Sequence, residues 1–156
     1  MELLIVLSPE RKSREAMQFS IAHAKEKNLS IKAVYVVEES ITKAVEKEMA
    51  ETGFIGDKPG SEVTTALNKD HKTRGEKILA DFKQLALKFG LAVKTEIKAG
   101  FYARVCEELA NASLVSEIIF ISRKRGFIDK LFGVDEVKQF KSAIDKPVHS
   151  YLSEIN

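Results

Sequence analysis

The chain has 156 residues, of which 44% are apolar and 31% are charged, and its 25 basic and 23 acidic residues leave a net charge of +2. This size and composition predict one domain, residues 1–156, that can bury a core of its own. No apolar run approaches the roughly 20 residues that span a bilayer. So small a net charge is not typical of nucleic-acid-binding proteins, and a single cysteine excludes an internal disulfide. The acidic second residue and short apolar run at the start do not resemble a secretory signal, so we expect a cytoplasmic protein.

Five segments are predicted to be β-strands. Residues 3–7 form a continuous apolar run, which is typical of a strand buried on both faces. Residues 91–98 alternate apolar and polar side chains, which indicates a half-exposed strand at a sheet edge. The predicted strands are 2–7, 31–37, 91–98, 117–122 and 147–152.

Helices are predicted between the strands. The first has apolar residues at helical spacing and ends at Asn28, a residue typical of a helix C-terminus. Gly75 is expected to fray or bend the longest one, whose inward stripe we place at Ile78, Phe82, Leu85 and Phe89. The predicted helices are 14–27, 41–52, 62–89, 102–111 and 135–144, with a glycine-rich loop at 53–60.

The alternation of strands and helices predicts an α/β fold with a mostly parallel sheet. We expect a three-layer αβα domain with an open five-stranded sheet in a flavodoxin-like layout. In such sheets ligands bind beyond the carboxyl ends of the strands, where the strand order reverses. The segments expected there are Ser8-Pro9 and Ser122-Arg123-Lys124-Arg125-Gly126. The three cations either hold an anion by charge alone or form an ordinary solvated loop.

Other chemistry-bearing residues give weaker patterns. Cys106 is expected to be a small core residue, because it shares helical spacing with apolar neighbours and has no base near it. His23 and His71 are expected at the surface, and the spacing of the histidines predicts no metal site. Phe54 and Ile55 either cap the strand-end crevice, dock a partner or fold onto the sheet. No sequence motif indicates an enzyme.

Several segments resemble the universal stress protein family, in family order and over essentially the whole chain. The resemblance implies an adenine-nucleotide α-hydrolase-like sheet of strand order 3-2-1-4-5, with Val36 at the nucleotide crevice. The matching segments are Ser13-Arg14-Glu15-Ala16-Met17 with Ala24, Val34-Tyr35-Val36-Val37-Glu38, Gly100, Ile118-Ile119-Phe120-Ile121-Ser122-Arg123, and Pro147-Val148.

The family's nucleotide loop is degenerate in this chain. Ser8 stands where ATP-binding members carry an aspartate. Gly126 and Gly133 keep the interval of the family's later glycines, but no alignment restores the earlier glycine pair. The hydroxyl after the last glycine is replaced by Val134, or by Asp135 if a residue is inserted. Side chains with a Cβ block the close backbone approach that a phosphate needs, so we expect no ATP in the family's usual mode.

These observations favour a non-enzymatic, stress-associated regulatory module that acts through dimerisation and contacts with an unidentified protein. Two alternatives stay open: a nucleotide-binding (ATP or AMP) switch using the basic loop, and an enzyme of the wider nucleotide-handling α/β group. No cofactor, membrane or nucleic acid is expected. The resemblance implies a homodimer through the last strand, whose residues are Val148, His149, Ser150, Tyr151 and Leu152.

Overall fold

The structure is a computed structural model, which describes residues 1–38, 57–123 and 135–154, and only the backbone of residues 57–68. The predicted helix 41–52 and the residues Phe54 and Ile55 lie outside the described residues, and so does the loop 124–134.

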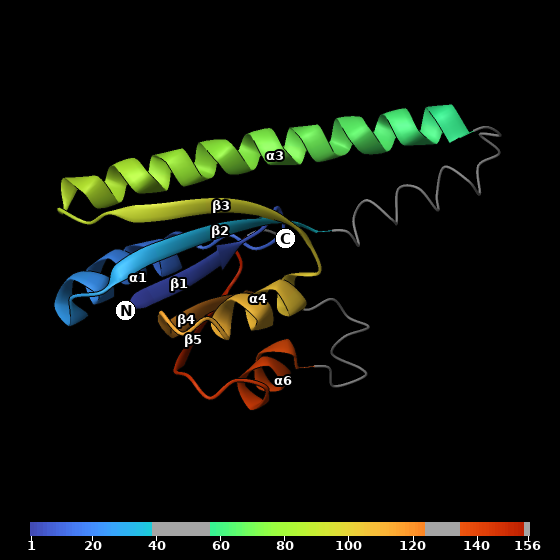
Figure 1. The fold of residues 1–156 in the computed structure, drawn as a ribbon. Helices are drawn as coiled ribbons and strands as arrows, with labels where there is room; N and C mark the ends of the chain where they lie inside the picture. Colours follow the sequence, from blue (N-terminus) through green and yellow to red (C-terminus); the bar gives the residue numbers. More distant parts are fainter. Residues whose placement is uncertain (39–56, 124–134, 155–156) are drawn as a thin grey trace.

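The sheet has five parallel strands in the order β3-β2-β1-β4-β5 (Figure 1). The predicted α/β fold and strand order are therefore confirmed, and the alternating strand does lie at an edge. The strands are β1 (Glu2–Leu7), β2 (Ser30–Glu38), β3 (Val93–Gly100), β4 (Val115–Ser122) and β5 (Val148–Leu152).

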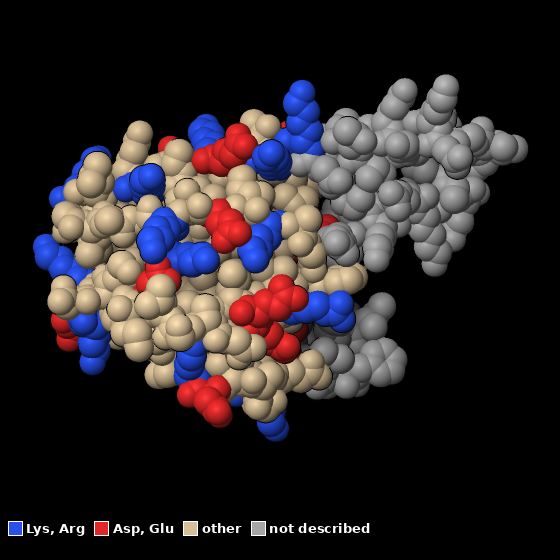
Figure 2. Space-filling model, in the orientation of Figure 1, with Lys and Arg blue, Asp and Glu red and all other residues tan. Residues whose placement is uncertain are grey.

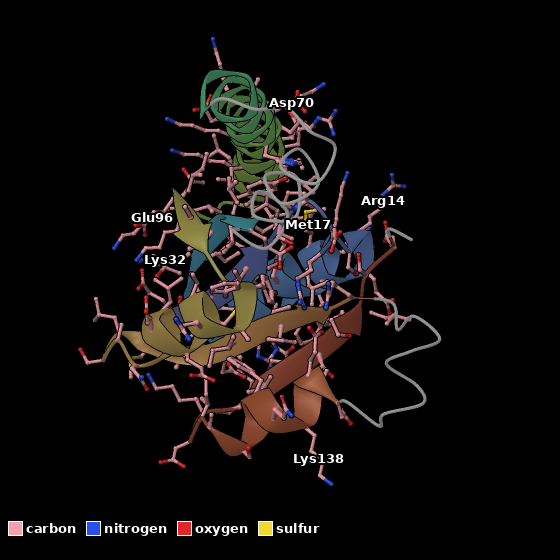
Figure 3. The ribbon with its side chains drawn as sticks, turned by 90° about the vertical axis from the view of Figure 1, so that its right-hand side faces the viewer. Arg14, Met17, Lys32, Asp70, Glu96 and Lys138 are labelled. Atoms are coloured by element: carbon pink, nitrogen blue, oxygen red, sulfur yellow. The ribbon has the colours of Figure 1, made fainter. Side chains whose placement is uncertain are left out.

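Helices cover both faces of this sheet. In Figure 3, which looks from the right of Figure 1, Arg14 and Asp70 belong to helices on one side and Lys138 to a helix on the other. The first layer holds α1 (Arg14–Lys27) and α3 (Asp57–Lys88), and the second holds α4 (Tyr102–Ala110) and α6 (Glu136–Ser142). Among the described helices, none is both long enough and apolar enough to cross a membrane.

Two apolar cores lie on the two faces of the sheet. Successive side chains of a strand point to opposite faces, so β1 contributes to both cores. Leu3, Ile5 and Leu7 pack in the core under α1 and α3, whereas Leu4 and Val6 pack in the core under α4 and α6. This accounts for the uninterrupted apolar run of β1.

Helix α1 has the predicted bounds because both ends are capped locally. The Ser13 hydroxyl accepts a hydrogen bond from the Ala16 N–H at 3.1 Å. At the other end Asn28 takes the left-handed conformation, with φ of 55°, and its N–H donates to the Ala24 carbonyl.

Helix α3 differs from its prediction at its start. It begins at Asp57, so residues 57–60 of the predicted loop form its first turn. Proline is tolerated there, because the first N–H groups of a helix have no partner within the helix. The helix also continues through Gly75 without a break. A Cβ at this position would lie 2.4 Å from Cδ1 of Tyr35, so the glycine allows the helix to pack directly on the tyrosine ring.

The inward face of α3 was predicted only in part. Phe82 is buried as expected and Ile78 is half-buried, but Leu85 and Phe89 are exposed. These two line a groove of about 580 Å³ between α1 and α3. Among the residues of α3 whose side chains are described, 69–88, Leu79 and Ala86 are also buried.

Candidate functional site

The candidate site lies where β1 and β4 separate at their carboxyl ends, which is where the strand order reverses. Cα pairing between these strands ends at Ile5 and Ile119. Beyond that point the Tyr102 hydroxyl donates to the Val6 carbonyl at 2.6 Å and accepts from the Ile121 N–H at 3.0 Å. A side chain of the protein itself therefore bridges the two strands at the position where this class of sheet binds ligands.

The Tyr102 hydroxyl is fully buried. Burial raises the pKa of Tyr102 well above its ordinary range, so the hydroxyl stays neutral and can donate to the carbonyl. The bridge is thus a stable feature of the fold at any pH near neutrality.

Arg11 covers the same point from the loop between β1 and α1. Its guanidinium carbon lies 4.1 Å from the centroid of the Tyr102 ring, and the side chain is 4% exposed. Nη1 donates to the Ile121 carbonyl at 2.9 Å. Nε donates to Glu38 at 3.2 Å, and the two terminal nitrogens donate to Glu136 at 2.6 and 3.1 Å. Residues from β2, β4 and α6 therefore hold one guanidinium.

The loop is fixed in this position from two sides. Ser8 and Arg11 exchange backbone hydrogen bonds of 3.0 and 3.1 Å, which close a tight turn. From the end of β5, the Ser153 hydroxyl donates to the Glu10 carbonyl at 2.8 Å. The turn and this bond place the side chain of Arg11 over the end of β4.

The charges at this point favour cations over anions. Burial lowers the pKa of Arg11, but the hydrogen bond to Glu136 and the nearby charges of Tyr102, Glu136 and Glu38 together outweigh burial, and the pKa is raised. Burial raises the pKa of Glu136, but the hydrogen bonds and the charge of Arg11, together with Arg123, lower it by more. The net shift of this pKa is therefore downward. Arg123 lies 3.6 Å from Glu10 and 3.8 Å from Glu136. The described charges here are two guanidinium groups and three carboxylates, the third being Glu38. Among the described residues, a phosphate would therefore meet more carboxylates than cations.

The predicted site residues are brought together only in part. Ser8 is buried and donates to Glu38 at 3.3 Å, so it belongs to the Arg11 network. Pro9 is half-buried in the turn, and Val36 lies in the core under α4 rather than at an open crevice. Ser122 donates to the Tyr151 carbonyl at 3.3 Å. Lys124, Arg125, Gly126, Gly133 and Val134 lie outside the described residues.

Three residues of the site were not predicted from the sequence: Arg11, Glu38 and Tyr102. Glu38 ends β2 and Arg11 follows β1 by four residues, so both lie at the carboxyl ends of neighbouring parallel strands. Two opposite charges that each follow a predicted strand are a weak signal for such a pair. Nothing in the local sequence indicated that Tyr102 would reach between two strands.

Charge is otherwise mixed over the described surface. Basic and acidic side chains are interspersed on the face shown in Figure 2. Cys106 is buried, as expected, and burial raises the pKa of its thiol well above the ordinary range, so it is not a ready nucleophile. The prediction of surface histidines is wrong. His71 is buried on the same helix face as Gly75 and Leu79, and His23 packs between Phe19 and Glu117.

The comparisons with known proteins show a shared fold. UspA, a universal stress protein from Lactobacillus plantarum, matches with a TM-score of 0.72 and 12% identity over 96% of each chain. A protein from the universal stress protein family of Burkholderia pseudomallei matches with a TM-score of 0.61 and 15% identity, over 96% of this chain and 94% of that chain. The universal stress protein from Archaeoglobus fulgidus in complex with dAMP has a TM-score of 0.51 and 12% identity, over 95% of this chain and 96% of that chain.

No protein-family model and no curated protein sequence matches the chain. The structural matches nevertheless confirm the fold that the resemblance implied.

Proposed function

We propose that this chain, which has the universal stress protein fold, is a cytoplasmic regulatory module that does not bind ATP in that fold's usual mode. It acts by forming a homodimer and by contacting another protein. The proposal is non-enzymatic, since the titratable side chains that the structure describes at the strand-end crevice are held in a network of hydrogen bonds and ion pairs.

One observation carries this proposal: Arg11 and Tyr102 occupy the point at which β1 and β4 separate. The guanidinium and the hydroxyl bond to the backbone of both strands, as a bound ligand would otherwise do. Glu38 and Glu136 neutralise the cation from within the chain. A nucleotide phosphate would have to break these charge-assisted hydrogen bonds before it met a positive group.

A second candidate function, a nucleotide-binding switch, is favoured by the nature of Arg11. A guanidinium group can bind a phosphate in the same bidentate geometry in which it binds a carboxylate. A neighbour with this fold is in complex with dAMP. In a switch of this kind a phosphate displaces Glu136 from Arg11 and releases α6. Arg123 is the other described cation within reach of this site.

The experiment that separates the two functions measures nucleotide directly. The purified chain is denatured, and the supernatant is chromatographed for adenine nucleotides. We expect none, and we expect ATP and AMP to leave the melting temperature unchanged. Stoichiometric nucleotide would overturn the proposal in favour of the switch.

A matched pair of variants sharpens the test. If the switch operates, Glu136→Gln frees Arg11 and raises the affinity for nucleotide, whereas Glu26→Gln, at an exposed carboxylate near the C-terminus of α1, leaves it unchanged. If our proposal holds, neither variant binds nucleotide. Nucleotide that binds and is then consumed on incubation would point to an enzyme.

The proposed pairing uses β5, which is an edge strand of the described sheet. Unpaired edges are usually covered or paired, and twofold dimers are the commonest oligomers. The residues of this edge are Val148, His149, Ser150, Tyr151 and Leu152, of which Ser150 and Leu152 are exposed. A homodimer through β5 would extend the sheet across two chains.

A further inference from the structure

Three side chains from three different elements converge on one point beside β5, apart from the Arg11 network. His23 lies on α1, Glu117 on β4 and His149 on β5. Nε2 of His23 lies 3.0 Å from both carboxylate oxygens of Glu117, and Nε2 of His149 lies 3.0 Å from one of them. One donor atom of each residue can be chosen so that all three lie within 4.8 Å of one another.

The backbone explains this convergence. Ile119 of β4 pairs with His149 of β5, so Glu117, two residues earlier, points to the same face of the sheet as His149. That face is the one covered by α1, and His23 comes down onto it from the helix. All three residues belong to one chain, so their arrangement does not depend on the proposed dimer.

An aromatic side chain fixes the two imidazoles. The Phe19 ring stacks on His23 with a centroid distance of 4.9 Å and an interplanar angle of 18°. Its centroid lies 4.9 Å from that of His149 as well. Because Phe19 and His23 are four residues apart on α1, they are neighbours on one helix face. Little side-chain freedom remains to be lost when the donor atoms bind a common ligand.

We propose that His23, Glu117 and His149 form a binding site for one divalent transition-metal ion, with Zn²⁺ as the best match and one coordination position open. Zinc takes histidine nitrogen and carboxylate oxygen at about 2.0–2.2 Å, which puts the ligand atoms of a tetrahedral site about 3.4 Å apart. The distances of 3.0 Å from Nε2 of His23 and from Nε2 of His149 to the Glu117 carboxylate would have to widen by a few tenths of an ångström to reach this value.

The donor set selects the class of metal. Two imidazoles and one carboxylate suit zinc and its first-row neighbours, whereas calcium and magnesium prefer oxygen ligands. The side chains of His23, Glu117 and His149 are 12%, 17% and 29% exposed, so an ion and a water molecule can reach them from solvent. Three protein ligands leave the fourth tetrahedral position for that water or for a group on another molecule.

The alternative is that the three residues form a hydrogen-bonded cluster that holds no metal. In that arrangement both histidines carry a proton on Nε2 and donate it to Glu117. Metal binding requires those protons to move to Nδ1 or to leave, since a nitrogen lone pair must face the ion. The two cases differ in whether a metal competes successfully for the same atoms.

The test uses the full-length, tag-free chain after treatment with EDTA and dialysis. Titration with Zn²⁺ in competition with a chromogenic chelator should give one ion per chain, and Co²⁺ should give the intense visible absorption of a four-coordinate site. Zn²⁺ should also raise the melting temperature, because it binds the folded state. The absence of binding at micromolar Zn²⁺, or half an ion per chain, would overturn the proposal.

Variants locate the site. Each variant that removes a proposed ligand should weaken Zn²⁺ binding by more than about 10-fold: His23→Ala, His149→Ala and Glu117→Gln. Losing a residue that only supports a metal ligand already weakens binding by about 10-fold or more, so losing a ligand should cost at least as much. His71→Gln removes the third histidine of the chain and should bind as the wild type does. Glu117→Gln is nearly isosteric, so it remains informative if an alanine variant fails to fold by circular dichroism. Equal affinity in His71→Gln and Glu117→Gln would contradict the assignment.

Discussion

The guanidinium carbon of Arg11 lies over the ring of Tyr102, 4.1 Å from its centroid, at the point where β1 and β4 separate. Each residue bonds to β4: Arg11 to the Ile121 carbonyl and Tyr102 to the Ile121 N–H. The two strands are thereby joined beyond the end of their ladder. At the position where open α/β sheets bind ligands, the described residues of this chain form a buried network of side chains.

Removing the charge of Arg11 should destabilise the protein strongly. Arg11→Met keeps an apolar stem over Tyr102 but leaves Glu38 buried without a cation. Breaking one partner out of a buried pair costs about 3–5 kcal/mol, so we expect a fall of that size in the free energy of unfolding. Urea unfolding at pH 7 measures it.

Arg123→Met is the matched control, since Arg123 is half exposed and lies 3.8 Å from Glu136, to which Arg11 bonds at 2.6 Å. Its effect should stay within about 0.5 kcal/mol. Similar losses in the two variants would mean that the Arg11 network is not buried as described.

The contribution of Glu136 should depend on pH. The pKa of Glu136 is lowered in the folded state, where Arg11 and Arg123 face it. A lowered pKa means that folding favours the charged form, so the stabilisation is complete above the ordinary glutamate pKa and is lost as the pH falls through the folded value. Glu136→Gln should therefore be less stable than the wild type by about 2 kcal/mol at pH 7, and the gap should close in acid.

Urea unfolding of both proteins between pH 7 and pH 3 checks this expectation. Glu10→Gln serves as the control, because Glu10 is about half exposed and should give a gap near zero throughout. A gap for Glu136→Gln that is constant with pH, or that widens in acid, would contradict the assignment of the ion pair.

Gly75→Ala should destabilise the protein although alanine favours a helix by about 1 kcal/mol. The added Cβ would lie 2.4 Å from the Tyr35 ring, and overpacking of this kind costs about 1–3 kcal/mol. Thermal unfolding should show a net loss, whereas Lys77→Ala on the exposed face of α3 should not. In a Tyr35→Val background the same glycine substitution should become stabilising, because the ring atoms it meets are gone.

The features that were predicted well are local ones. Ser13 and Asn28 cap α1 by bonds to residues three and four positions away, so a short stretch of sequence contains the whole signal. The apolar run of β1 likewise reports the burial of that strand directly. The alternation before Gly100 predicted the edge position of β3 but not its burial pattern, since Thr95 is exposed and Glu96 is half-buried. The strand order followed from the resemblance to a family, which carries the topology with it.

The features that were missed depend on contacts between distant segments. Arg11 meets Glu38 and Glu136 across 27 and 125 positions in the chain. No periodicity or motif specifies such a meeting, and the charges looked like ordinary surface residues. The inward face of α3 differs from the predicted one for the same reason. The close approach of Gly75 to Tyr35 sets the rotation of the helix, and this places Leu85 and Phe89 outward.

The last prediction concerns the β5 edge. The wild-type chain should have a mass of twice 17.4 kDa by light scattering, and Leu152→Glu should shift it to the monomer. Leu152 is 59% exposed at the end of the edge strand, and a charge buried in a paired interface would be desolvated without a partner. Leu87→Glu changes a leucine that is 68% exposed on α3, far along the chain from β5, and should leave the mass unchanged. A wild-type chain that stays monomeric at micromolar concentration, or equal effects of the two variants, would place the interface elsewhere.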